Sequence, residues 1–127
     1  MRLDRPELAA VFVGGFAGAV SRAAVAEGLP HHGGRWPWAT FAVNVAGALV
    51  LGWVAVRLAR SPVVRPLLGT GFCGALTTFS TMQLELLQML DAERWALAAG
   101  YAAASVAAGL LAVVVGARLG RVAVRAR

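Results

Sequence analysis

Gly71-Phe72-Cys73-Gly74-Ala75-Leu76-Thr77-Thr78-Phe79-Ser80-Thr81 interrupts the third long apolar segment of the chain near its middle. Hydrocarbon offers no hydrogen-bond partner, so hydroxyl and free backbone groups occur at membrane depth only where they line a cavity or face other protein. The stretch therefore predicts a helix that is broken halfway across a membrane.

The composition indicates a membrane protein with a single domain. The chain has 127 residues, is 59% hydrophobic and has a mean hydropathy of +0.70. A helix of about 20 apolar residues crosses the roughly 30 Å hydrocarbon core. Four segments meet this length and predict an all-α integral membrane fold with a broken third helix: residues 8–26, 38–58, 67–90 and 95–117. All five prolines fall outside the interiors of these segments.

The distribution of arginine predicts the orientation in the cell membrane. Four spans place the N-terminus, the second connection and the C-terminus on one side, with nine arginines: Arg2, Arg5, Arg57, Arg60, Arg65, Arg118, Arg121, Arg125 and Arg127. The other side has three: Arg22, Arg35 and Arg94. Because basic residues concentrate in cytoplasmic loops, both termini are expected in the cytoplasm.

Small residues predict close helix packing. Gly14 and Gly18 lie one turn apart in the first span, and Gly109, Gly116 and Gly120 recur along the fourth. Such spacings let helices approach closely, within a chain or between subunits. We therefore expect an oligomer, most simply a dimer.

Polar side chains recur at helical spacing inside the spans. Thr40 and Asn44 are four residues apart, as are Tyr101 and Ser105, so each pair shares one helix face. Taken singly, such residues more often join helices than bind a ligand. Together with the threonines and Ser80 of the interrupted stretch they predict a track of neutral hydrogen-bond donors.

Neutral donors favour a small anion over a cation. A cation site in a membrane usually has a central carboxylate, whereas the only carboxylate well inside a span is Glu85, toward one end. The single cysteine, Cys73, excludes an intrachain disulfide. No His/Asp constellation indicates catalysis, and no basic stripe with aromatic residues indicates nucleic-acid binding.

Three segments resemble the signatures of the CrcB/Fluc fluoride channel family, and they occur in the family's order. They are Gly14-Gly15-Phe16-Ala17-Gly18-Ala19-Val20-Ser21-Arg22, Thr40-Phe41-Ala42-Val43-Asn44-Val45-Ala46-Gly47, and the interrupted stretch 71–81. The resemblance covers all four spans, and its third motif is the most specific.

The resemblance implies a passive fluoride channel, built as an antiparallel dimer with two anion pathways. It also implies a non-transported Na⁺ at the dimer centre, held by the backbone carbonyls of Gly74 and Thr77. A break in a helix releases such carbonyl groups from their intrahelical hydrogen bonds. The positions that match the family's anion pathway are Thr40, Asn44, Phe79, Ser80, Met82, Tyr101 and Ser105.

Several positions bear on how far this chain follows the family. Met82 stands where the family has a second aromatic ring, and Gly109 stands where it has a further hydroxyl. Arg22 matches a motif arginine near a vestibule, where it would attract anions or, alternatively, extend to the membrane interface. Glu85 also matches the family, but the residues give no role for it.

The arginine bias sharpens the expectation for the dimer. The family's homodimers insert the same sequence in both orientations, which requires nearly balanced flanking charge. The nine-to-three split instead predicts one fixed orientation and a heterodimer with a partner subunit of opposite bias.

Two other classes compete with this interpretation. A small four-helix exporter of organic cations coupled to protons has the same size and topology, but it needs an acidic residue inside the first span. None lies between Glu7 and Glu27. A structural membrane subunit of a larger complex would explain the hydrophobicity but not the ordered motifs.

Overall fold

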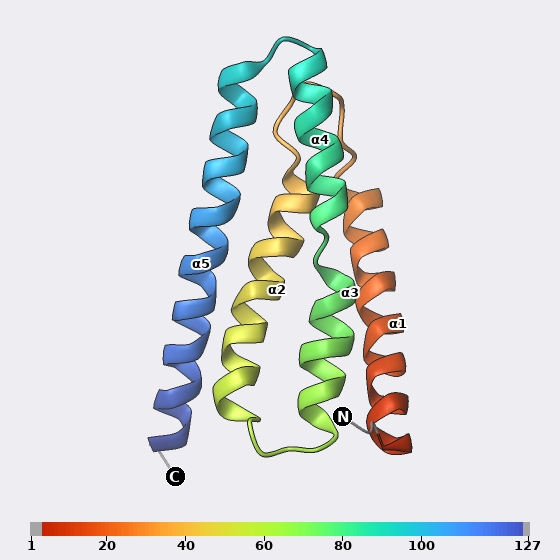
Figure 1. Cartoon of the computed structure of the whole chain (residues 1–127), viewed down its shortest axis with the longest axis vertical. Coiled ribbons are helices and arrows are strands. Elements are labelled where there is room, and N and C mark those ends of the chain that lie inside the picture. The colour runs from red at the N-terminus through yellow and green to blue at the C-terminus, as the bar shows by residue number, and fades with distance from the viewer. Residues whose placement is uncertain (1–3, 126–127) are drawn as a thin grey trace.

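The computed structural model describes residues 4–125, and within that range the regular structure is entirely helical (Figure 1). The helices are α1 (Arg5–Gly28), α2 (Trp38–Arg57), η1 (Pro66–Cys73), α3 (Gly74–Leu76), α4 (Phe79–Asp91) and α5 (Trp95–Arg125). These helices form four rods, of which the third consists of η1, α3 and α4 in succession. The rods run roughly antiparallel to one another (Figure 1). The prediction of an all-helical fold is confirmed.

Three of the four rods are continuous helices that are long and apolar enough to cross a membrane. They comprise Arg5–Gly28, Trp38–Arg57 and Trp95–Val122. The third rod is broken where Thr77 and Thr78 adopt extended backbone angles, with φ/ψ of −77°/151° and −146°/120°. The predicted break in the third helix is thus present, at the second half of the interrupted stretch.

The predicted spans and the observed helices agree best for the second span. Helix α1 extends beyond residues 8–26 at both ends, and α5 continues well past residue 117. Apolar length indicates only the part of a helix that matches hydrocarbon, so it does not locate helix ends outside it. Helices α4 and α5 are joined by a tight turn in which Glu93 has a φ of 58°.

Glycines bring two pairs of helices into close contact. A Cβ added at Gly14 would overlap the carbonyl oxygen of Leu67, and one at Gly18 would overlap that of Phe72. The predicted contact face of the first span therefore packs on η1 within the same chain. On the other side, Gly52 of α2 approaches the backbone of α5, and Gly116 of α5 approaches that of α2.

The segment before the break is a π-helix of eight residues, Pro66–Cys73. Its turns are wider than α-helical turns, and π-helical turns occur frequently at functional sites. The sequence did not predict this feature, since apolar periodicity alone does not distinguish a short π-helix from an α-helix.

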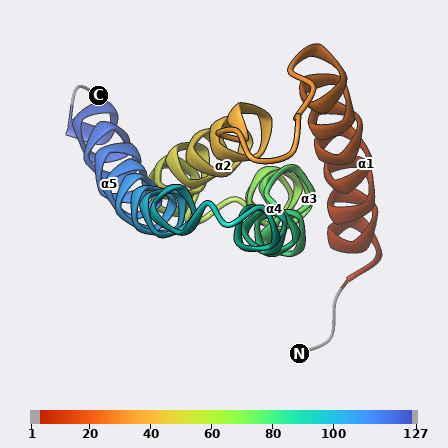
Figure 2. The same ribbon diagram turned by 90° about the horizontal axis from the view of Figure 1, so that it is seen from above.

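The broken rod lies between α1 and α2 when the molecule is seen along its length (Figure 2). Helix α5 lies beside α2, at the opposite edge from α1. Both ends of the described chain and the 58–65 connection lie at one end of the molecule (Figure 1). This is the arrangement on which the arginine argument depends, although Arg2 and Arg127 lie outside the described residues.

A buried cluster near the other end joins α4 and α5. It consists of Met82, Met89, Ala98 and Tyr101. The indole ring of Trp36, in the connection before α2, packs edge-on against Tyr101 with ring centroids 5.4 Å apart. This cluster positions Tyr101 beside the candidate site.

Candidate functional site

Asn44 of α2 binds both sides of one peptide unit at the break in the third rod. The Thr78 backbone N–H donates to Asn44 Oδ1 at 2.8 Å. The Asn44 side-chain amide Nδ2 donates to the Thr78 carbonyl oxygen at 3.1 Å. The carboxamide thus takes the place of a neighbouring backbone and satisfies groups that the broken helix leaves free.

Side chains of the threonines complete the two helix ends at the break. The Thr77 hydroxyl and the Thr77 N–H both donate to the Cys73 carbonyl oxygen, at 2.9 Å and 3.0 Å. Thr78 is the N-cap of α4, since its hydroxyl oxygen accepts the Thr81 N–H at 3.3 Å. Serine and threonine are favoured at this position because they satisfy one of the unpaired N–H groups of the first turn.

Several carbonyl oxygens at the break are left without a backbone donor, and those of Gly74 and Thr77 are among them. In a continuous helix the Thr78 N–H would donate to Gly74 and the Thr81 N–H would donate to Thr77. Here these N–H groups bond to the Asn44 and Thr78 side chains instead. Within residues 4–125, no hydrogen bond to the carbonyl oxygen of Gly74 or Thr77 replaces them. Gly74 lies on the exposed surface of the single chain.

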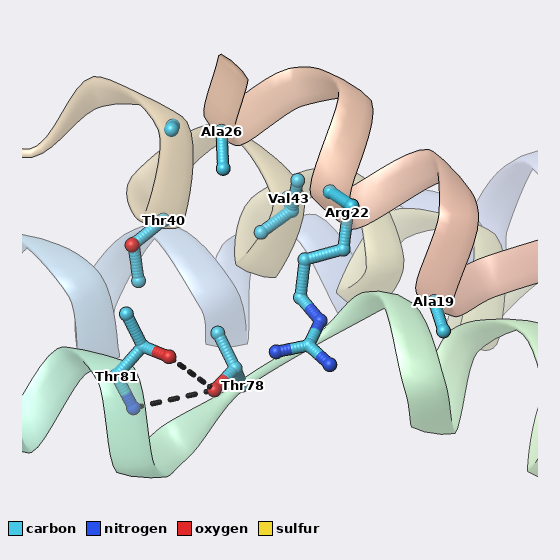
Figure 3. A pocket seen from close by; sticks show the side chains of 9 residues that line it. Ala19, Arg22, Ala26, Thr40, Val43, Thr78 and Thr81 are labelled. Atoms are coloured by element: carbon cyan, nitrogen blue, oxygen red, sulfur yellow. Dashed lines mark hydrogen bonds between the residues drawn. The ribbon is translucent and has the colours of Figure 1, made fainter. Parts of the chain in front are cut away.

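Arg22 reaches the same break from α1. Its Nε donates to the Ala75 carbonyl oxygen at 3.0 Å. Within the part of the chain that the structure describes, no group accepts a hydrogen bond from the two terminal guanidinium nitrogens. Figure 3 shows the guanidinium extending from α1 toward Thr78. A fixed positive charge with free N–H donors is therefore held beside the break.

These groups surround a pocket of about 260 Å³ between α1, α2 and the start of α4. Alanine and valine side chains form much of its wall, and Arg22, Thr40, Thr78 and Thr81 contribute the polar groups. No carboxylate lines it. Its polar lining therefore combines a guanidinium with hydroxyl groups, which together suit a small anion.

Glu85 lies buried next to this pocket with both carboxylate oxygens occupied. The Thr40 hydroxyl donates to Oε1 at 2.5 Å, and the Tyr101 hydroxyl donates to Oε2 at 2.7 Å. Glu85 is 6% exposed and Tyr101 is fully buried. The network links α2, α4 and α5 and compensates a carboxylate that would otherwise be costly at this depth.

Two of the predicted pathway residues lie close to this network. Ser105 is one helical turn beyond Tyr101 on α5, and its buried hydroxyl has no hydrogen-bond partner among the described residues. Met82 belongs to the buried cluster that contains Tyr101. Their part in an anion pathway stays a prediction.

The last two of the predicted pathway residues, Phe79 and Ser80, lie on the outer surface of the chain. Phe79 is 69% exposed, and Ser80 is also exposed, with its hydroxyl 3.4 Å from that of Thr78. The structure thus gathers Arg22 and Thr40 around one pocket, with Asn44 at the adjoining break, but it leaves Phe79 and Ser80 facing outward.

The sequence did not indicate two of these contacts. The bond from Arg22 to Ala75 joins residues 53 positions apart, and nothing in either local pattern signals it. Glu85 is recognisable in the sequence because it is the one carboxylate well inside a span, but the sequence does not show that Thr40 and Tyr101 are its hydrogen-bond partners.

The fold and the site define a small multi-pass membrane protein with donor groups arranged around a broken helix. Residues 9–117 match the family described as CrcB-like protein, Camphor Resistance (CrcB). The chain belongs to this family.

Similar proteins carry a consistent name. A relative from Mycolicibacterium paratuberculosis, named "Fluoride-specific ion channel FluC 1", is 52% identical over 122 residues, which cover 93% of this chain and 92% of the relative. One of the same name from Geobacillus kaustophilus is 39% identical, covering 87% of this chain and 95% of the relative. "Fluoride-specific ion channel FluC" from Chlorobaculum tepidum is 41% identical, covering 87% and 91%.

Proposed function

We propose that this chain is a subunit of a fluoride channel that exports cytoplasmic fluoride passively. The observation that carries the proposal is the pocket beside the break, where the Arg22 guanidinium and three threonines converge without a carboxylate. The names of the similar proteins support fluoride as the ion. No observation favours the alternative of a proton-coupled exporter of organic cations.

The membrane potential alone supplies the driving force. One elementary charge gains about 2.3 kcal/mol per 100 mV across the membrane, so export of an anion from a negative interior needs no fuel and no catalytic step. A small anion loses its hydration shell on entry, and several weak donors offset this cost without holding the ion too tightly to leave.

The functional unit is an antiparallel dimer. This part of the proposal is supported by the exposure of Phe79 and Ser80, which are predicted pathway residues on the surface of the single chain. A second subunit packed on this face would bring its own side chains opposite them. In the membrane, the remaining apolar surface faces lipid.

A structural Na⁺ at the dimer centre fits the same face. The carbonyl oxygens of Gly74 and Thr77 have lost their helical donors, as described above. Carbonyl oxygens of unwound helices are typical Na⁺ ligands in membrane proteins. These two residues would hold the ion, and its charge would make the interior more favourable for an anion.

The arginine bias supports a fixed orientation in the plasma membrane with both termini in the cytoplasm. A dimer of antiparallel subunits then requires a homologous partner of opposite orientation, which makes it a heterodimer. A protease-cleavable tag at the C-terminus should be protected in intact cells and cleaved in inverted vesicles. Equal cleavage in both preparations would refute the fixed orientation.

Fluoride efflux from liposomes tests the proposed function. Purified protein is reconstituted in fluoride-loaded vesicles, alone and with a coexpressed homologue of opposite charge bias, and efflux is followed with a fluoride electrode after adding a potassium ionophore. We expect efflux with the partner and much less without it. A proton gradient should drive no uptake of organic cations. Absence of fluoride efflux in both preparations would overturn the proposal.

A further inference from the structure

The two-sided bond between Asn44 and Thr78 has a consequence for the backbone one turn earlier. The Thr78 N–H can donate either to Gly74 O, which continues the helix, or to Asn44 Oδ1, which breaks it. The structure has the second bond, at 2.8 Å. The carboxamide also holds the Thr78 carbonyl, at 3.1 Å, so the whole peptide unit is turned toward α2.

We infer that Asn44 is a positioning residue for the Na⁺ site, because it captures the Thr78 peptide and thereby keeps the Gly74 carbonyl oxygen free to bind the ion. Asn44 does not itself touch the ion in this assignment. The inference rests on the proposed Na⁺ site, and it adds a residue of α2 that acts through the backbone of the third rod.

Packing around the break supports this role. Gly47 lies nearly one turn after Asn44 on α2, and a Cβ there would overlap the Thr77 Cγ2 methyl group. The same face of α2 therefore admits the Thr77 side chain and binds the Thr78 peptide. The Thr77 hydroxyl donates to the Cys73 carbonyl oxygen at 2.9 Å, which fixes the Thr77 side chain on this face of α2.

The chain allows a site-specific measurement without any mutation. Asn44 is the only asparagine, and Thr77-Thr78 is the only pair of consecutive threonines. Threonine labelled with ¹³C at the carbonyl carbon and ¹⁵N at the amide therefore gives a single directly bonded signal, from the Thr77–Thr78 peptide. Labelling the side-chain carbonyl carbon of asparagine adds a second unique probe.

In solid-state NMR of the dimer in lipid, with this chain labelled and its partner subunit unlabelled, we expect a dipolar contact between the Thr78 nitrogen and the Asn44 side-chain carbon. We also expect the Thr77 carbonyl signal to shift when Na⁺ replaces N-methyl-D-glucamine. Absence of the contact would overturn the inference, as would a Thr77 signal that is the same in both cations.

Asn44→Leu keeps a similar volume and removes both hydrogen bonds. The Thr78 N–H can then return to Gly74 O, and the Na⁺ concentration at half-shift should rise roughly tenfold, the change expected from a net hydrogen-bond energy of about 1.4 kcal/mol. Leu49→Val, at an exposed position on the same helix that lines neither the pocket nor the break, is the control, and it should leave this midpoint unchanged. An unchanged midpoint in Asn44→Leu would contradict the inference.

The outcomes separate this inference from the proposed function. Protein that shows the predicted Na⁺ titrations but no fluoride efflux would refute the function and leave the role of Asn44 intact. Fluoride efflux together with identical Na⁺ midpoints in the wild type and Asn44→Leu would refute the role of Asn44 and leave the proposed function intact. If Asn44→Leu does not fold, the contact measured in the wild-type protein still decides the bond on which the inference depends.

Discussion

The Tyr101 hydroxyl donates a 2.7 Å hydrogen bond to the Glu85 carboxylate, and both side chains are buried where α4 packs against α5. The second oxygen of Glu85 accepts from Thr40 of α2. One carboxylate therefore ties together three of the four rods next to the pocket that contains Arg22.

Tyr101→Phe should destabilise the protein without changing its packing volume much. The variant leaves one oxygen of a buried carboxylate unpaired, and such losses cost about 1–3 kcal/mol. Chemical denaturation in micelles, followed by circular dichroism, measures the change. Tyr101→Phe in a Glu85→Gln background serves as the control, because the glutamine carries no charge that needs the bond. Equal loss in both backgrounds would show that the hydrogen bond is not the cause.

Arg22→Gln should slow fluoride efflux most strongly at low ionic strength. A fixed charge beside a pocket raises the local concentration of anions, by about tenfold or more in favourable cases, and salt screens this effect. Flux is measured in liposomes at two salt concentrations. Arg22→Lys keeps the charge but loses the planar donor that binds Ala75, so it should retain most of the salt dependence. Arg60→Gln, an exposed residue at the other end of the molecule, should leave the flux as it is.

Phe79→Ile should impair conduction more than folding. The Phe79 ring is 69% exposed on the single chain, so its replacement removes little packing within the subunit, whereas an aliphatic side chain cannot offer an anion the positive edge of an aromatic ring. Efflux and thermal stability are measured on the same preparation. Phe12→Ile, at a 77% exposed position on α1, is the matched control. Undiminished efflux in Phe79→Ile would remove this residue from the pathway.

Gly18→Val should destabilise the fold, because the new side chain would overlap the Phe72 backbone of η1. Overpacking of this kind costs about 1–3 kcal/mol. Gly109→Val makes the same chemical change where nothing lies within 4 Å of the new Cβ. Denaturant midpoints should therefore separate the two variants. Similar midpoints would mean that α1 and η1 can move apart at little cost.

Local patterns in the chain were enough to predict the number of rods, the place of the break and the glycine face of α1. Each of these depends on local composition: apolar length, helix-breaking hydroxyl and small residues, and a four-residue spacing of glycines. The sequence also marked Asn44 and Glu85 as polar residues where polarity is expensive. These features are readable because the cost of an unpaired group in hydrocarbon does not depend on the rest of the fold.

Which polar groups bond to one another became clear only from the packed helices. Asn44 binds a peptide 34 residues away, and Thr40 binds a carboxylate 45 residues away. Such pairings depend on the crossing and rotation of whole helices, and a shift of one residue turns a side chain by about 100° around the axis. The π-helix before the break and the outward position of Phe79 have the same origin. Local pattern can place a polar group on a helix, but the packing of the other helices determines what it meets.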